Sequence, residues 1–303
     1  MESMDWPAGE QKQQVCVTGA GGFIGSSLVK ELLQRGYAVR GTARNPEARK
    51  NAHLHSLDGA KEWLSLLRAD VLDYKSLRSA FSLCDGVFHV ASPVSDNDPE
   101  LMAVAIEGTK NVINAAADMG VQRVVFTSSY GAVHMNPNRS PDQQWRRHQR
   151  GIQLLVVVPS LTLGEMLQPT LNLGIDLLIV SYMKGTKKTY PNTVSGYVDV
   201  QDVARAHVLV YETLTAHGRY LCIGEVVHRS EFIRMMRELF PQYPITTKCK
   251  DDNGPKVKPY KFSTQRLQAL GMKFTPLKES LHKTVVCLQA QGHIPLLPPK
   301  SAL

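Results

Sequence analysis

The chain has 303 residues and a formal net charge of +8 at pH 7, with 35 Lys and Arg residues against 27 Asp and Glu residues. This length is sufficient for a substantial core, either in one large α/β domain or in two smaller lobes. No basic motif interleaved with aromatic residues occurs, and an anionic small molecule attracts positive charge as well as nucleic acid does. We therefore expect a small-molecule partner and no nucleic acid.

Five cysteines are scattered without metal-like spacing, which predicts no metal site and favours a reducing, cytoplasmic compartment. No secretory signal opens the chain and no apolar run reaches membrane-spanning length, so no membrane partner is expected. Residues 1–12 are polar and lack periodicity, which indicates a flexible tail. None of these features predicts an oligomeric state.

A glycine-rich turn between a short apolar strand and a helix is the first chemical signature. The strand 15–17 is followed by the letters TGAGGFIG, and apolar residues then recur at helical spacing. Gly19 permits a tight turn, Gly22 lets the backbone approach a pyrophosphate, and Gly25 lets helix and strand pack closely. The alternative is a structural glycine turn without a ligand. The residues of this turn assigned to a dinucleotide cofactor are Thr18, Gly19, Gly22, Phe23, Ile24 and Gly25.

The end of the next predicted strand, residues 37–43, indicates which dinucleotide is bound. NAD-selective sites carry an acidic residue there for the ribose 2′-hydroxyl, whereas arginine accommodates a 2′-phosphate. Here the strand is followed by Arg44, with Lys50 nearby in the basic segment. Arg44 can bond a phosphate through two N–H groups at once. NADP(H) is therefore the predicted cofactor, and a solvated basic loop is the alternative.

Strands and helices alternate along the first half of the chain. Further strands are predicted at 64–70, 87–91, 124–127 and 154–158, and helices at 73–81 and 99–120. This alternation predicts an α/β fold, with a Rossmann-type doubly wound parallel sheet in an NADP-binding domain at 13–160. Residues 161–303 are expected to form mainly a smaller C-terminal substrate lobe and a tail. A strand near 218–224 is assigned to the main sheet.

Together with the glycine motif, several longer segments resemble the plant cinnamoyl-CoA reductases. These belong to the extended short-chain dehydrogenase/reductase family and have dihydroflavonol reductases among their relatives. The segments are VRGTARNP (39–46), FHVASP (88–93), VVFTSS (124–129), HRSEF (228–232), FPQYPITTKCK (240–250) and KPYKFS (258–263). The resemblance implies NADPH-dependent reduction of a hydroxycinnamoyl thioester in phenylpropanoid (lignin) metabolism. It adds Asp70, Val71, Ala91 and Pro159 to the cofactor site.

The resemblance also implies a catalytic Ser that hydrogen-bonds the carbonyl oxygen, and a Y-x-x-x-K pair whose Tyr supplies a proton. Ser129 matches the Ser, at the end of its strand. The Tyr and Lys are absent, because Tyr130 is the only tyrosine between Ser129 and Pro159 and no lysine occurs between residues 111 and 183. Tyr130 is followed four residues later by His134, and its side chain is expected to diverge from that of Ser129.

The interval that should carry the pair is shorter than in relatives. A short crossover helix is predicted at 140–151, with Trp145 as its only large apolar residue, so an exposed apolar patch and reduced stability are expected. The sequence thus predicts an NADP(H)-dependent oxidoreductase that is catalytically impaired. The alternatives are a non-catalytic NADP(H)-binding regulatory protein and a truncated isoform.

Overall fold

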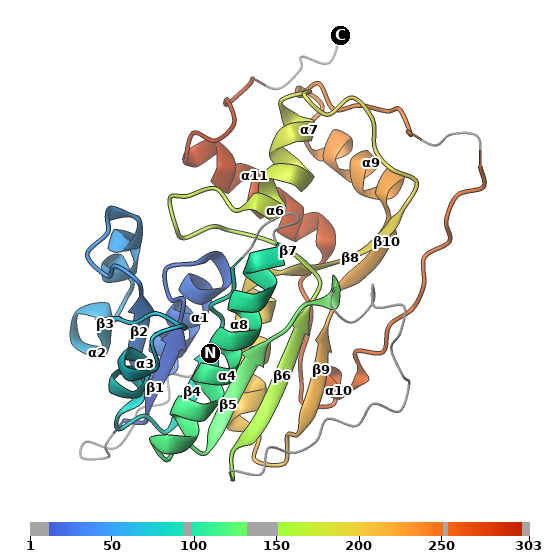
Figure 1. Cartoon of the computed structure of the whole chain (residues 1–303). Helices are drawn as coiled ribbons and strands as arrows, with labels where there is room; N and C mark the ends of the chain where they lie inside the picture. Colours follow the sequence, from blue (N-terminus) through green and yellow to red (C-terminus); the bar gives the residue numbers. More distant parts are fainter. Residues whose placement is uncertain (1–11, 94–98, 132–150, 251–253, 299–303) are drawn as a thin grey trace. The chain divides into compact units, whose positions relative to one another are not determined.

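The computed structural model describes residues 12–93, 99–131, 151–250 and 254–298. These residues form two compact units. Figure 1 labels their helices and strands. The first unit contains residues 12–93, 99–128, 151–157 and 204–219. The second unit contains residues 129–131, 158–203, 220–250 and 254–298.

The main sheet has seven strands in the order β3-β2-β1-β4-β5-β6-β9. These are β1 (Gln14–Thr18), β2 (Ala38–Ala43), β3 (Leu64–Arg68), β4 (Gly86–His89), β5 (Arg123–Thr127), β6 (Gln153–Pro159) and β9 (Gly218–Cys222). All neighbouring pairs from β3 to β6 are parallel. The strand order reverses at β1, which β2 and β4 flank, and in such sheets a ligand binds beyond the carboxyl ends of the strands at this point. The predicted Rossmann-type, doubly wound α/β fold is confirmed.

Helices connect these strands. They are α1 (Phe23–Gln34), α2 (Ala60–Trp63), α3 (Tyr74–Phe81), α4 (Pro99–Asp118) and α8 (Val200–Glu212), with a 3₁₀ helix η1 (Arg49–Ser56) after β2. The sequence explains the end of α1, because Gly36 has a φ of +84° and Tyr37 N–H donates to the carbonyl of Leu32 at 3.1 Å. This is the usual glycine C-cap. The start of α3 is equally local, since the Asp73 carboxylate accepts from the N–H groups of residues 75 and 76.

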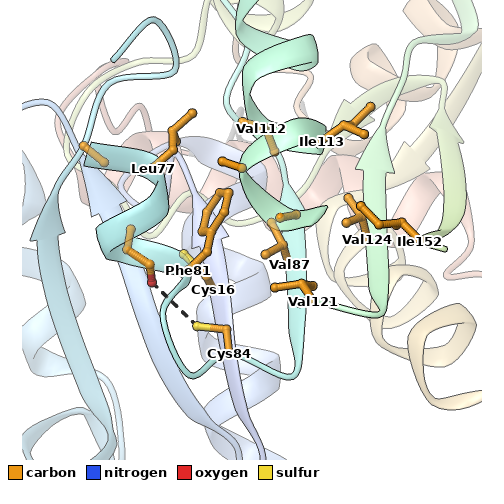
Figure 2. Close-up of a cluster of buried hydrophobic side chains, with 14 residues drawn as sticks. Cys16, Leu77, Phe81, Cys84, Val87, Val112, Ile113, Val121, Val124 and Ile152 are labelled. Carbon is orange, nitrogen blue, oxygen red and sulfur yellow. Dashed lines mark hydrogen bonds between the residues drawn. The ribbon is translucent and has the colours of Figure 1, made fainter. Parts of the chain in front are cut away.

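A buried apolar cluster packs α3 and α4 against one face of the sheet (Figure 2). Phe81 of α3 and Val112 of α4 are fully buried with Val87 of β4. Cys16 of β1 and Cys84 are buried in the same cluster, and burial raises the pKa of both thiols. This core fixes β1 and β4, whose carboxyl ends carry the glycine turn and the loop after residue 89.

The second unit contains a three-stranded sheet in the order β10-β8-β7. Its strands are β7 (Leu161–Leu163), β8 (Val194–Asp199) and β10 (Glu225–His228), with β8 parallel to β7 and antiparallel to β10. Its helices are α6 (Leu173–Ile175), η2 (Asp176–Val180), α7 (Ser181–Met183), α9 (Arg229–Leu239), α10 (Gln265–Gln268) and α11 (Leu277–Ala290). Tyr197 of β8 stacks on Phe232 of α9 with ring centroids 4.6 Å apart, which joins the sheet to that helix.

Each strand and helix predicted between residues 15 and 127, and the strand predicted at 154–158, is present, with ends shifted by at most two residues. Residues 140–150 of the crossover helix predicted at 140–151, including Trp145, and residues 1–11 of the tail predicted at 1–12 lie outside the described residues. Within the described ranges, no group of three His, Cys, Asp or Glu side chains is arranged to hold a metal ion. None of the helices in those ranges combines the length and apolar character that crossing a bilayer requires.

Candidate functional site

In the glycine turn at the end of β1, a side chain on either of two glycines would clash with neighbouring backbone. Gly19 has a φ of +68°, and a Cβ there would lie 2.9 Å from the Cα of Ala91. A Cβ on Gly25 would lie 2.2 Å from the carbonyl oxygen of Gly19. The turn is closed by the N–H of Gly22, which donates to the same carbonyl at 3.0 Å. The turn and the helix that follows it therefore approach each other as closely as the glycine spacing predicts.

The N-terminus of α1 is open to an anion. Gly22 is the exposed N-cap residue and provides no side-chain cap for the first N–H groups. Phe23 is buried and Ile24 is half-buried, so the first turn is anchored while its backbone donors remain available. Uncapped N–H groups and the positive end of the helix dipole together favour a phosphate. The observed geometry thus fits a dinucleotide pyrophosphate at this turn.

A buried polar network joins the glycine turn to the end of β4. The Thr18 hydroxyl oxygen accepts from the N–H groups of Val90 and Ala91, both at 3.1 Å, and lies 2.9 Å from His89 Nδ1. The Thr18 hydrogen is therefore directed to His89, whose other nitrogen, Nε2, faces the Thr109 hydroxyl at 3.3 Å. Burial lowers the pKa of His89 to about 4, so the ring is neutral near pH 7. The network holds the predicted cofactor residues Thr18 and Ala91 in fixed relation.

Arg44 and Lys50, the cations predicted to bind a 2′-phosphate, are both exposed. Arg44 directly follows β2, and Lys50 lies in η1. Neither side chain forms a hydrogen bond or an ion pair with another residue in the part of the chain that the structure describes. Both are therefore available to an anionic ligand.

Asp70 and Val71 follow β3 in a loop that is fixed against α4. The Asp70 carboxylate accepts from the N–H of Leu72 at 2.9 Å, and the Val71 carbonyl accepts from the Asn111 amide at 3.1 Å. A Cβ on Gly108 would lie 2.7 Å from the side chain of Val71, so loop and helix are in close contact. These contacts hold the loop against α4.

Ser129, the predicted catalytic Ser, is exposed and belongs to the second unit, as does Pro159 at the end of β6. The Ser129 hydroxyl oxygen accepts a local hydrogen bond from the N–H of Gly131 at 3.1 Å. The Tyr130 hydroxyl lies 2.5 Å from that of Tyr260, so the two side chains have different partners. His134, which follows Tyr130 four residues later, lies outside the described residues.

Two side chains of η1 contact the glycine turn and were not predicted. Asn51 is buried and lies against Gly21, and His53 Nε2 lies 2.8 Å from the Ser26 hydroxyl of α1. The segment around them is polar and has no apolar periodicity, so nothing local in the sequence distinguishes a buried Asn from a solvated one.

Comparisons with known proteins identify the family of this chain. A family model described as the NAD dependent epimerase/dehydratase family matches residues 15–148. The chain is 62% identical over 320 residues to cinnamoyl-CoA reductase 1 of Oryza sativa subsp. japonica, covering 95% of this chain and 94% of the relative. It is 50% identical over 315 residues to cinnamoyl-CoA reductase 1 of Petunia hybrida, covering 94% of each.

Solved structures share the fold. Vestitone reductase from alfalfa (Medicago sativa L.) has a TM-score of 0.77 and 26% identity, and the match covers 93% of this chain and 100% of that one. The yeast methylglyoxal/isovaleraldehyde reductase Gre2, solved in complex with NADPH, has a TM-score of 0.74 and 22% identity, with the same coverage. At 22% identity the likeness to Gre2 shows the fold alone.

The alignment with the rice relative is longer than this chain. It extends over 320 positions, whereas 95% of the 303 residues of the chain is only about 288 residues. The difference leaves about 30 positions that the rice protein fills and this chain does not. The Petunia alignment, with 315 positions over 94% of this chain, leaves a similar gap.

Proposed function

Because the chain belongs to the cinnamoyl-CoA reductase-like group of the NAD-dependent epimerase/dehydratase family, we propose that it binds NADP(H) in the cytoplasm and reduces hydroxycinnamoyl thioesters at or near background. The family membership rests on the 62% and 50% identities, each over nearly the whole chain. The cofactor preference and the impaired catalysis rest on particular residues of this chain.

The glycine turn and the basic segment after β2 support NADP(H) as the cofactor. The uncapped N-terminus of α1 suits the pyrophosphate, and Gly19 and Gly25 keep side chains out of this turn. Arg44 and Lys50 would hold the 2′-phosphate, since both are exposed and no acidic residue ends β2. When bound, the nicotinamide supplies a hydride to a carbonyl carbon.

The missing Tyr and Lys are the observation that carries the proposal of impaired catalysis. Ser129 would donate a hydrogen bond to the carbonyl oxygen, but the oxygen also requires a proton as negative charge develops on it. The only tyrosine between Ser129 and Pro159 is Tyr130, whose hydroxyl contacts Tyr260. The gap of about 30 positions against the rice relative is consistent with loss of the segment that carries the pair.

A non-catalytic NADP(H)-binding protein is the second candidate function. It is favoured by the contrast between a glycine turn with complete geometry and a strand end that retains only Ser129 of the three expected catalytic groups. Such a protein would respond to the cofactor or occupy a partner without turnover. A truncated isoform without a function of its own is the third candidate, and sequencing the transcript across residues 139–151 tests it directly.

Purified protein distinguishes these candidates by two measurements. Fluorescence titration with NADPH and NADH reports cofactor binding, and NADPH oxidation with a hydroxycinnamoyl-CoA substrate reports turnover, with the rice relative as positive control. We expect NADPH binding with turnover near background. Turnover at the rate of the rice relative would contradict impaired catalysis, and failure to bind either cofactor would contradict the assignment of the glycine turn.

A further inference from the structure

Asn51 of η1 fills the space between the glycine turn and the loop after Arg44. Its side chain is buried, with 2% exposure, although the segment around it is polar. The amide nitrogen Nδ2 donates to the carbonyl of Asn45 at 2.8 Å and approaches that of Pro46 at 3.4 Å. The amide oxygen Oδ1 lies where a Cβ on Gly21 would come within 2.1 Å of it. One side chain therefore contacts both structures that the cofactor is expected to bind.

A second side chain of the same 3₁₀ helix fixes η1 to α1. His53 Nδ1 lies 2.9 Å from the carbonyl of Lys50, and since a carbonyl only accepts, this nitrogen carries the hydrogen. The other ring nitrogen, Nε2, lies 2.8 Å from the Ser26 hydroxyl oxygen. Ser26 lies in the first turn of α1, one turn after the N-cap Gly22. The backbone of Lys50 is thereby fixed relative to the helix end that faces the pyrophosphate.

We infer that Asn51 is a positioning residue for cofactor selectivity, which holds the loop carrying Arg44 at a fixed distance from the glycine turn. This inference rests on the proposed NADP(H) function. The pyrophosphate and the 2′-phosphate belong to one molecule, and the adenosine ribose that joins them limits their separation, so Arg44 meets the 2′-phosphate only if its backbone is held within that range. Arg44 itself has no partner among the described residues that would hold its side chain, so the backbone constraint from Asn51 matters.

The Asn51→Leu variant tests the inference, because leucine has a similar volume and cannot donate to the Asn45 carbonyl. We expect the Kd for NADPH to rise about 3- to 10-fold, which is the usual consequence of losing one hydrogen bond. The Kd for NADH should stay within about twofold, since NADH has no 2′-phosphate to engage Arg44. The selectivity ratio, measured by titration with both cofactors, should therefore fall by the same factor.

Asn45→Ala is the matched control, because Asn45 contributes only its backbone carbonyl to this contact and alanine keeps that carbonyl. Its ratio should equal that of the unmodified chain. If Asn51→Leu does not fold, Asn51→Ser, which removes the amide without adding an apolar group, is measured instead. A merely structural role would weaken both cofactors equally and leave the ratio unchanged, and that result would overturn the inference.

Arg44→Ala provides the second test. If Asn51 acts through Arg44, adding Asn51→Leu to Arg44→Ala should leave the selectivity ratio unchanged. A further loss of ratio in the double variant would overturn the inference. Equal affinities for NADPH and NADH in the unmodified chain would instead overturn the proposed cofactor preference, so the two failures are distinguishable.

Discussion

The glycine turn and the strand end at Ser129 belong to different units of the chain, and their polar side chains have different kinds of partner. At the glycine turn, buried polar side chains have side-chain partners, as Thr18 has the buried His89 and Ser26 has the half-buried His53. At Ser129 the hydroxyl has a local backbone partner, and the neighbouring Tyr130 is engaged by Tyr260. This difference supports the proposal that the chain binds the cofactor but lacks a group that supplies the proton.

The largest expected effect comes from restoring the missing Tyr and Lys. Inserting a family-length segment with a Y-x-x-x-K pair after Ser140 should raise the rate of aldehyde reduction by about 10²- to 10⁴-fold, the usual contribution of a general acid. NADPH oxidation with a small aldehyde measures it. The matched control carries Phe in place of the inserted Tyr and should stay near background. NADPH-dependent reduction at the rate of the rice relative by the unmodified chain, abolished by Ser129→Ala, would mean that another residue supplies the proton.

A substitution of Gly25 in the glycine turn should have the next largest effect. In Gly25→Ala the new Cβ would meet the Gly19 carbonyl oxygen at 2.2 Å, and because that oxygen belongs to the backbone, the turn must distort. We expect a loss of about 2–4 kcal/mol in the free energy of unfolding, despite the better helix propensity of alanine, together with loss of NADPH binding. Gly254→Ala, where a Cβ meets nothing within 4 Å, is the control for both measurements. Equal denaturation midpoints for the two variants would show that this contact is not limiting.

Reversing the charge at Arg44 alters the cofactor preference without touching the turn. Arg44→Asp should weaken NADPH binding by about 10- to 100-fold, because a charge-assisted hydrogen bond is replaced by repulsion. NADH binding should be retained or improved, since the carboxylate can accept from the ribose 2′-hydroxyl. Arg49→Asp makes the same charge change on another exposed arginine of the segment and should have a smaller effect. An unchanged preference in Arg44→Asp would assign the 2′-phosphate to another cation.

The buried His89 gives the glycine turn a pH dependence of stability. Its pKa is lowered to about 4 in the folded chain, so between the ordinary value of 6.5 and about 4 the unfolded chain binds more protons, and stability falls as pH falls. The expected loss between pH 7 and pH 5 is about 2 kcal/mol. In His89→Asn, whose amide oxygen can still accept from Thr18, the slope of unfolding free energy against pH should decrease. Burial also lowers the pKa values of His53 and His228, so these two residues still contribute to the pH dependence of the unfolding free energy in this variant. An unchanged slope would show that His89 does not titrate in this range.

The fold and the glycine turn are predictable from sequence because their determinants are local. Gly19, Gly25 and Gly36 each meet a backbone requirement within a few residues, and helical and strand periods mark the flanking elements. The Thr18–His89 contact is not local, since it depends on the register of β1 against β4, in which these two residues are partners. The role of Asn51 was not predicted because its burial also depends on a non-local contact, the close approach of the 3₁₀ helix to Gly21.

The second unit was predicted least well. β7 and β10 have three and four residues, too few for an alternating pattern to stand out, and η2 interrupts the α-helical period between α6 and α7. Ser129 could be placed at a strand end from its motif, but which partner its hydroxyl takes depends on the chain that follows.

The burial of Cys16 makes its alkylation a measure of how the main sheet opens. It lies in the central strand β1 with no exposed surface, and its raised pKa keeps it in the unreactive protonated form. An alkylating reagent can therefore modify it only after the sheet around β1 has opened, whereas Cys249 and Cys287 are partly exposed in the closed state. The rate at which Cys16 is alkylated, followed by mass spectrometry of its peptide, therefore reports how often the main sheet opens, without any ligand or dye.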